Sequence, residues 1–208
     1  MKPPRRENFM NRNRKAVIER NTTETRISLK INLDGRGSFS IHTPIGFLNH
    51  MLNLFARHGL FDLTLKARGD VDVDIHHTNE DVGIVLGLAI KKALTNKQGI
   101  RRFGFASVPI DEALVEVSLD LSSRPYLQFT VHGLRPTVHS KEYSLNYLKQ
   151  FLRALAVNAG LTLHIEIISG EDSHHIIEAV FKALARALRE AVSIDPRIKG
   201  ILSTKGSL

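Results

Sequence analysis

Polar and apolar residues alternate over several short stretches of the chain, and this period of two is typical of half-buried β-strands. The clearest case is residues 26–33, which read Arg-Ile-Ser-Leu-Lys-Ile-Asn-Leu. The Asp-Gly-Arg-Gly sequence at residues 34–37 predicts a hairpin turn into the next strand. Further strands are expected at residues 38–42, 62–67, 104–109, 113–120, 126–131 and 161–168.

Longer stretches between these strands predict helices. Residues 46–57 place their large apolar side chains on one side of a helix, and His58-Gly59 is expected to end it through a glycine C-cap. A second helix is expected over residues 145–158, with Gly160 ending it. The two other helix-forming runs are residues 82–94 and 180–191.

The order of strands and helices occurs twice, which indicates an internal repeat. Leu-Thr-Leu at residues 63–65 returns at residues 161–163, 98 positions later. Neither half can bury its helix faces alone, so the two halves should pack together through either their sheets or their helices. The expected fold is α+β, a tandem repeat in which each half is a mainly antiparallel or mixed four-stranded sheet covered by two helices. The expected boundaries are an arm at 1–15, half-repeats at 16–99 and 100–193, and a tail at 194–208.

A His-His-x-x-Glu motif stands before the second helix of each half, and the two copies are also 98 positions apart. Residues four apart on a helix lie about 40° apart around its axis, whereas neighbours lie about 100° apart. His76 and Glu80 can therefore share one metal ion, as can His174 and Glu178. One His-His pair alone would be more typical of a helix start at the surface, but the duplication favours metal ligands.

The middle histidine of each motif, His77 or His175, points away from its own His/Glu pair. If the two motif-bearing helices face each other, each middle histidine can join the ion held by the opposite helix. This crossed arrangement predicts two ions. A mixture of imidazole and carboxylate suits Mn, Fe, Co, Ni or Zn better than Ca or Mg.

Composition narrows the classes of function. The net charge is +8, but residues 1–15 carry +5 of it, so the excess lies mainly in an arm that is expected to be disordered and solvated. The 208-residue chain contains no cysteine, which excludes disulfides and thiolate ligands. No apolar run reaches the ~20 residues of a membrane span, and no signal peptide is evident. The expected location is the cytoplasm.

Several specific stretches give the chain a resemblance to the imidazoleglycerol-phosphate dehydratases of histidine biosynthesis, from about Ala16 to the C-terminus. In addition to the two histidine motifs, they are Arg20-x-Thr22-x-Glu24-Thr25, Gly46-Phe47-Leu48-x-His50-Met51-Leu52, His58-Gly59, Arg101-Arg102-Phe103-Gly104, Asp111-Glu112-Ala113-Leu114, Ser122-x-Arg124-Pro125 and Ser203-Thr204-Lys205-Gly206. The fold implied by this resemblance is a tandem half-barrel of four strands over two helices, similar to the second domain of a small-subunit ribosomal protein.

The resemblance implies a dinuclear manganese site. One ion would take His50, His77, His174 and Glu178. The other would take His76, Glu80, His175 and the residue at position 150, where a histidine is common but this chain has Gln150; His139 is an alternative ligand. The resemblance further implies a homo-oligomer of 24 chains with active sites between subunits.

This chain also has Asn49 where the family motif has aspartate beside His50. An asparagine is not a charged acceptor, so Asn49 is expected to give a neighbouring histidine less support than the aspartate would.

The implied reaction removes water from imidazoleglycerol phosphate to give imidazole acetol phosphate. Glu24 is the candidate acid/base group, beside the metal-binding His50, Glu80 and Glu178 as catalytic residues. Arg57 and His58 are candidate substrate contacts, although two basic groups also suit the end of a helix. The candidates for holding the phosphate are Arg102, Arg124, Ser203, Thr204 and Lys205.

Two other functions remain open at this level. A two-metal hydrolase of a phosphorylated small molecule would use the same ligands and would release inorganic phosphate. A basic RNA-binding module would use the N-terminal arm, but the chain has three tyrosines and no tryptophan, and so offers few aromatic side chains for stacking on bases.

Overall fold

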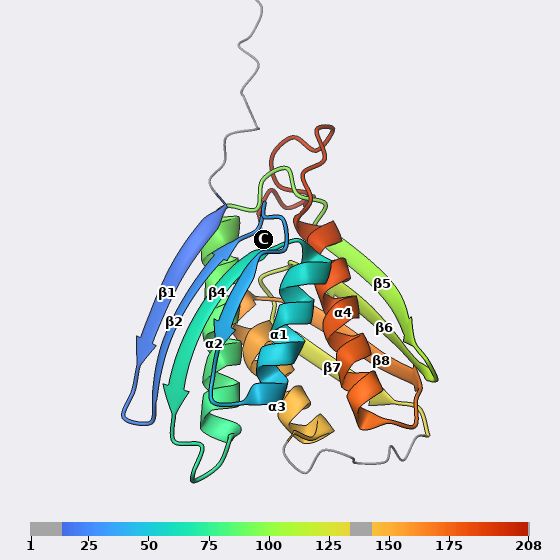
Figure 1. Cartoon of the computed structure of the whole chain (residues 1–208). Coiled ribbons are helices and arrows are strands. Elements are labelled where there is room, and N and C mark those ends of the chain that lie inside the picture. The colour runs from blue at the N-terminus through green and yellow to red at the C-terminus, as the bar shows by residue number, and fades with distance from the viewer. Residues whose placement is uncertain (1–13, 134–142, 208) are drawn as a thin grey trace, which may run out of the picture.

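Two four-stranded sheets and four helices make up the computed structural model, which describes residues 14–133 and 143–207 (Figure 1). The first half contains β1 (Lys15–Asn21), β2 (Thr25–Asn32), β3 (Phe39–His42), α1 (Gly46–Gly59), β4 (Asp62–Gly69) and α2 (His76–Leu94). The second half contains β5 (Phe103–Ile110), β6 (Ala113–Asp120), β7 (Tyr126–Val131), α3 (Leu145–Ala159), β8 (Thr162–Ser169) and α4 (Ser173–Val192).

The two sheets share one topology, which confirms the internal repeat. Their strand orders are β1-β2-β4-β3 and β5-β6-β8-β7. All neighbours are antiparallel except the last pair of each sheet, β3 with β4 and β7 with β8, which are parallel. Both sheets are therefore mixed, as expected.

The predicted hairpin at residues 34–37 is wrong, because β3 pairs with β4 and not with β2. The hairpin of this half joins β1 to β2 instead, and β1 is a strand that the sequence pattern did not mark. Asp62 holds the intervening loop against the start of β4, since its Oδ1 accepts hydrogen bonds from the backbone N–H groups of Arg36 (2.9 Å) and Ser38 (3.2 Å).

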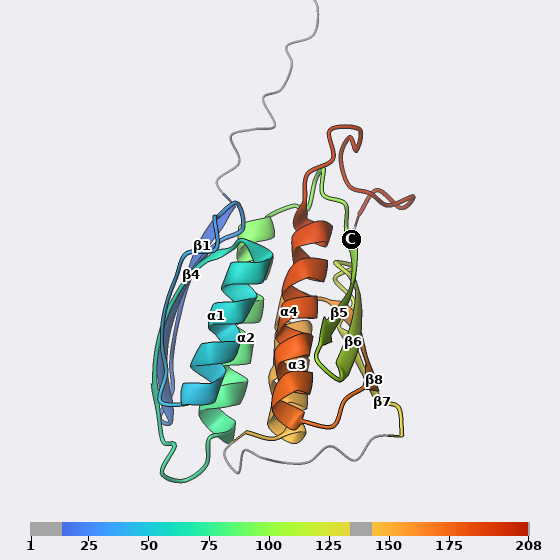
Figure 2. The same cartoon turned by 45° about the vertical axis from the view of Figure 1, so that its right-hand side comes forward.

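The halves pack through their helices, which form two inner layers between two outer sheets (Figure 2). The strands alternate buried and exposed residues, as in β2 and β8, because one face of each sheet covers helices and the other faces outward. The apolar sides of all four helices meet in one continuous core. The halves thus pack through their helix faces, which is one of the two arrangements that the sequence allowed.

Across the two halves the helices pack in two pairs, α1 on α4 and α2 on α3. The condition for the crossed arrangement, that α2 and α4 face each other, is therefore not met within one chain. Gly83 and Gly87 explain part of this pairing, because a Cβ added at either position would lie 2.7 Å from a backbone carbonyl oxygen of α3. Only glycine permits so close an approach of two helix backbones.

Of the two glycines expected to end helices, one is confirmed in this role and the other is not. The left-handed residue after α1 is Leu60, with φ of 55°, and not Gly59. Gly59 is required for another reason, since an added Cβ would lie 2.3 Å from the Phe61 ring. Gly160 does cap α3 in the left-handed conformation, with φ of 68°.

The basic arm is shorter than expected. Arg14 is buried, where its guanidinium pairs with Asp34 and donates to the carbonyl oxygen of Val192 at the end of α4. Lys15 already belongs to β1. Residues 1–13 of the predicted arm lie outside the described residues. Among the helices that the structure describes, none is both long and apolar enough to cross a lipid bilayer.

Candidate active site

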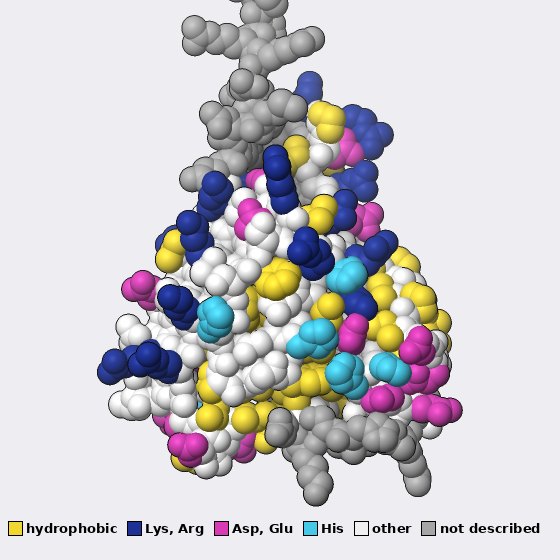
Figure 3. Space-filling model, viewed as in Figure 1, with side chains coloured by type: hydrophobic (Ala, Val, Ile, Leu, Met, Phe, Trp, Pro, Cys, Tyr) yellow, Lys and Arg dark blue, Asp and Glu magenta, His cyan; other side chains and the backbone are white. Residues whose placement is uncertain are grey.

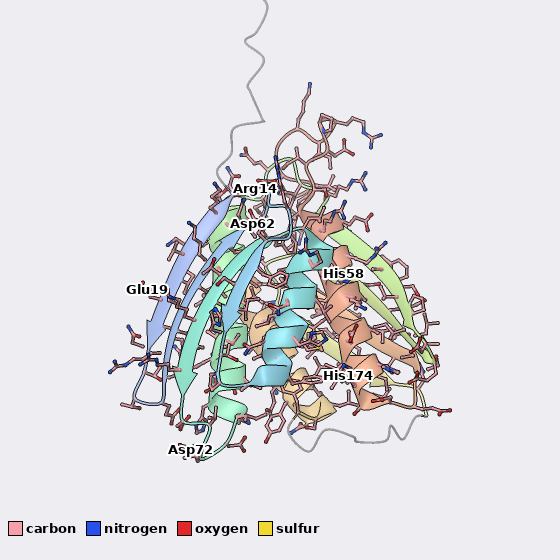
Figure 4. All side chains as sticks on the ribbon, viewed as in Figure 1. Arg14, Glu19, His58, Asp62, Asp72 and His174 are labelled. Carbon is pink, nitrogen blue, oxygen red and sulfur yellow. The ribbon has the colours of Figure 1, made fainter. Side chains whose placement is uncertain are left out.

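Three predicted metal ligands converge where α1 crosses α4. His50 comes from α1, and His174 and Glu178 come from successive turns of α4. Figure 4 shows His174 on α4. One ligand atom from each residue lies within 4.8 Å of the other two, and the Glu178 carboxylate is 3.4 Å from His174 Nε2 and 3.6 Å from His50 Nε2. Asp172 caps α4 by accepting from the His174 N–H, which fixes this first turn. Histidines gather on the same face of the molecule (Figure 3).

Basic groups surround the carboxylate of this cluster. Lys182 lies one turn after Glu178, and its Nζ is 2.6 Å from Glu178 Oε1. Burial alone would raise the pKa of Glu178, but Lys182, His50 and His174 outweigh burial and hold that pKa below its usual value. Burial, followed by the charges of Lys182 and Arg186, lowers the pKa of His58. His58 is thus placed beside the cluster and favours its neutral form.

The equivalent place on the other side of the molecule, where α2 packs on α3, is less complete. His76 Nε2 lies 3.1 Å from the Glu80 carboxylate, as the i, i+4 spacing predicts. The residue that corresponds to His50 is Gln150, whose Oε1 is buried without a hydrogen-bond partner among the residues that the structure describes. This side therefore offers two convergent ligands, and the suggested substitute His139 lies outside the described residues.

The middle histidines point away from both pairs, as predicted, and each is held by a carboxylate. His77 Nδ1 lies 3.0 Å from Asp70 Oδ2, and His175 Nδ1 lies 2.8 Å from Glu112 Oε2. These hydrogen bonds raise the pKa of both histidines. A carboxylate on Nδ1 also orients the ring and leaves Nε2 as the nitrogen for a metal. Within one chain, His77 does not join His50, His174 and Glu178.

Glu112 is as firmly held as the histidine it orients. The backbone N–H groups of Asp172 (2.9 Å) and Glu171 (3.2 Å) donate to its Oε1. The N–H of Asp172, followed by His175, lowers the pKa of Glu112 to about 2, so this side chain is a permanent carboxylate near neutral pH. It joins the turn before α4 to the motif on α4.

Glu24 stands on a turn that the first motif helix holds in place. Asp81 follows Glu80 on α2 and is nearly buried; it accepts hydrogen bonds from Arg20 Nε (2.9 Å) and from the hydroxyl of Thr25. Between these anchors, the Glu24 carboxylate lies 3.7 Å from His77 Nδ1 and remains half exposed. The candidate acid/base group Glu24 thus lies beside the metal-ligand candidate His77.

The five residues predicted to hold phosphate line one cavity of about 880 Å³, together with Ser122, Ser123 and residues 197–199, 201, 202 and 207. Asp120 fixes Arg102 by a bidentate ion pair, at 2.6 and 2.9 Å, and the Leu202 carbonyl accepts from Arg102 Nη1. Arg57 lies elsewhere, with its guanidinium 5.6 Å from the centre of the Phe39 ring.

The cavity lined by the phosphate-binding candidates and the cluster of metal-ligand candidates lie at opposite ends of α4. His174 is in its first turn, whereas the Arg102 N–H donates to the carbonyl oxygen of Ala191 in its last turn. At a rise of 1.5 Å per residue, the distance between them along α4 is about 25 Å. A small phosphorylated imidazole cannot reach both within one chain.

Asn49 does not contact the histidines that it was expected to support. Its Oδ1 accepts from the Thr43 N–H (2.9 Å), and its Nδ2 donates to the Thr43 carbonyl oxygen (3.0 Å). The side chain ties the loop before α1 to the helix. Within one chain, Asn49 therefore has a local role and does not hold a metal-ligand candidate.

Known proteins resemble this chain over most of its length. A family model described as imidazoleglycerol-phosphate dehydratase matches residues 43–188. The chain belongs to this family. The imidazoleglycerol-phosphate dehydratase of Geobacter metallireducens is 52% identical to this chain over 195 residues, which is 94% of this chain and 99% of the relative. The dehydratase named for Clostridium botulinum is 56% identical over 197 residues, covering 93% and 97% respectively.

Solved structures of imidazoleglycerol-phosphate dehydratases share the fold. The one from Staphylococcus aureus has a TM-score of 0.77 and 35% identity, covering 87% of this chain and 99% of that one. The one from Pyrococcus furiosus has a TM-score of 0.78 and 38% identity, covering 92% and 100% respectively. The protein is accordingly a dehydratase, a hydro-lyase, and the α+β tandem-repeat fold is confirmed.

The sequence missed three side chains of this dehydratase that the structure places at the site: Asp70, Glu112 and Lys182. The i, i+4 spacing from Glu178 to Lys182 was a visible signal for an ion pair. Glu112 lies in a stretch that carries the family resemblance, but its contact with His175 spans 63 positions of the chain and no local pattern reveals it.

Proposed function

We propose that the protein dehydrates imidazoleglycerol phosphate to imidazole acetol phosphate in histidine biosynthesis, using two manganese ions. The observation that carries the proposal is the convergence of His50, His174 and Glu178 in a chain of this family. Two imidazoles and one carboxylate form a donor set that suits Mn, and the remaining sites on such an ion are available for further ligands.

The proposed ligand sets follow the two sides of the molecule. One ion takes His50, His174 and Glu178, and the other takes His76 and Glu80. The middle histidines complete these sets from a neighbouring copy, His77 for the first ion and His175 for the second. Their support by Asp70 and Glu112 leaves the rings oriented for this role.

The bound ions supply Lewis acidity for the imidazole and the departing oxygen. The reaction breaks one C–H and one C–O bond of the glycerol phosphate side chain, releases water and leaves an enol that becomes a ketone. Glu24 moves the proton, because its carboxylate is half exposed beside His77. Arg102, Arg124 and Lys205 hold the phosphate, with Ser203 and Thr204 as further donors.

The separation of the metal-ligand candidates from the phosphate-binding candidates supports active sites that lie between subunits. The distance of about 25 Å along α4 exceeds the reach of the substrate, so the ligands of one copy must meet the phosphate-binding groups of another. Exposed apolar rings on the outer face of the second sheet, Phe103, Phe105 and Tyr126, provide surface for such contacts. An assembly of 24 chains and a cytoplasmic location remain predictions.

A turnover assay tests the proposed reaction. Protein stripped of metal and reloaded with Mn should form the ketone from imidazoleglycerol phosphate, and unloaded protein should not. Release of inorganic phosphate in place of the ketone would favour the two-metal hydrolase. Retention of RNA that is lost at high salt, without either product, would favour the RNA-binding module.

Metal removal tests the assembly. Ions that join ligands from two copies stabilise the assembled state, so chelation should convert a large particle into small oligomers. Light scattering after size exclusion gives the mass of both forms. An unchanged mass after confirmed metal loss would contradict shared ions.

A further inference from the structure

Lys97 is a buried cation that the proposed reaction does not use. It lies in the loop between α2 and β5, with 7% of its surface exposed and a left-handed backbone, φ 56°. Its Nζ donates to the Leu121 carbonyl oxygen at 2.9 Å and to Ser123 Oγ at 2.8 Å. Both acceptors are neutral, and the nearby Asp120 carboxylate is already paired with Arg102. The burial of this ammonium is therefore costly.

The residue that Lys97 contacts, Ser123, is itself held in an unfavourable conformation. Its φ of 61° is left-handed, which is uncommon for a residue other than glycine. Ser123 is pinned from the opposite side by Gly160, whose carbonyl oxygen accepts from the Ser123 N–H and whose position leaves no room for a side chain. The turn is therefore fixed between a buried ammonium and a helix end.

Ser123 faces the cavity that holds the phosphate-binding candidates, next to Arg124. A serine hydroxyl has one proton to donate. Because Ser123 Oγ accepts from Lys97, its own proton is directed away from the ammonium, toward the open side that is the cavity. Accepting from the lysine also polarises the hydroxyl and makes it a stronger donor.

We propose that Ser123 donates a hydrogen bond to the phosphate monoester of the substrate and that Lys97 is the positioning residue that orients and polarises its hydroxyl. The proposal rests on the function proposed above, and it adds a donor to the phosphate site. Lys97 itself is walled off from the cavity and acts through Ser123.

Inorganic phosphate is the probe, because it binds the site without turnover. Its affinity for the full-length, Mn-loaded protein is measured by calorimetry for Ser123→Ala, Lys97→Met and the double variant. Lys91→Met is the matched control, since it removes a nearby lysine that is exposed and touches no part of the cavity. Melting curves establish that each variant folds.

Loss of the Ser123 hydroxyl should weaken phosphate binding about 5-fold, and loss of Lys97 about 10-fold. The double variant should also lose about 10-fold and not the product of the two, because both changes remove one coupled donor. Lys91→Met should bind phosphate within about 2-fold of wild type, as expected for a screened surface charge. Ser123→Gly should lose the same affinity as Ser123→Ala while relieving the left-handed strain and raising the melting temperature.

Unchanged phosphate affinity in Ser123→Ala and Ser123→Gly would overturn the proposal, and so would multiplicative losses in the double variant. If Lys97→Met does not fold, the two serine variants decide alone. A wild-type protein that forms product and binds phosphate, with serine variants that bind equally well, refutes this inference only. A wild-type protein that does neither refutes the proposed function as well.

Discussion

The two helix pairs of this dehydratase have the same framework but different contents. Where α1 packs on α4, His50 is half exposed and joins His174 and Glu178. Where α2 packs on α3, the corresponding Gln150 turns its oxygen into the protein, and the residues that the structure describes offer His76 and Glu80 no third ligand. One substitution in a repeat has thus made the two sides unequal.

The helix contacts differ in parallel with the ligands. On α2, Gly83 and Gly87 let the backbone of α3 come close. The corresponding positions on α4 carry Phe181 and Ala185, which are both buried, and the Phe181 ring lies 5.4 Å from the Phe151 ring of α3. A duplicated fold thus keeps its topology while the side chains at its helix contacts differ between the two copies.

The largest expected effect comes from removing the carboxylate ligand of one helix pair at a time. Glu178→Gln removes the charged ligand of the complete set and should weaken one of two Mn-binding events by about 100-fold, equivalent to about 2.7 kcal/mol. The matched change, Glu80→Gln, should weaken the other event. Calorimetry on chelator-stripped protein resolves the two. If both variants weaken the same event, the ions do not follow the two helix pairs.

A smaller effect tests the close approach of α2 and α3. Gly87→Ala places a Cβ 2.7 Å from the Leu155 carbonyl oxygen and should lower the free energy of unfolding by about 2 kcal/mol. Gly46→Ala is the control, since no atom lies within 4 Å of its added Cβ. Urea unfolding of metal-free protein measures both. Equal stability of the two variants would show that the glycine contact does not limit the packing.

Restoring the missing ligand should act on one side only. Gln150→His should tighten the weaker Mn event by about 10-fold, or about 1.4 kcal/mol, because imidazole binds Mn better than an amide oxygen does. The reverse change, His50→Gln, should loosen the tighter event by a similar factor. A weaker event that does not tighten would mean that position 150 points away from the ion or that another residue already fills this place.

The smallest effect concerns the loop before α1. Asn49→Asp removes the donor to the Thr43 carbonyl oxygen and places a charge beside it, so stability should fall by about 1 kcal/mol. Mn affinity should not change, because Asn49 contacts no ligand. Thermal unfolding and the same calorimetry give both numbers. A change in Mn affinity with unaltered stability would restore the original interpretation of this residue as a support for a ligand.

Much of the fold could be predicted because its signals are local. Alternation marks the strands, and the 98-residue repeat relates the halves. Strand pairing could not be read in the same way: Asp-Gly at residues 34–35 ends a strand equally well whether the chain folds back or crosses over. Because α1 connects β3 to β4 along the chain, the chain crosses over and β3 pairs with β4 in parallel, which no turn residue encodes.

The metal ligands were predictable as residue types but not as one group. The i, i+4 rule correctly joined His76 to Glu80 and His174 to Glu178. The partner of each pair depends on which helices meet, and α2 and α4 do not form a packed pair within one chain. The glycine pair at positions 83 and 87 was the available signal, since glycines one turn apart within a helix favour close contact with another backbone.

The distance along α4 between the metal-ligand candidates and the cavity of the phosphate-binding candidates has a consequence for genetics. Suppose that each active site takes its metal ligands from one copy and its phosphate-binding groups from another. An allele defective only in Glu178 then damages the metal-binding part of the site, and an allele defective only in Arg124 damages the phosphate-binding part. Expressed together, their products would assemble some sites that combine the intact part of each. Two alleles that are separately inactive would then complement each other within one mixed particle.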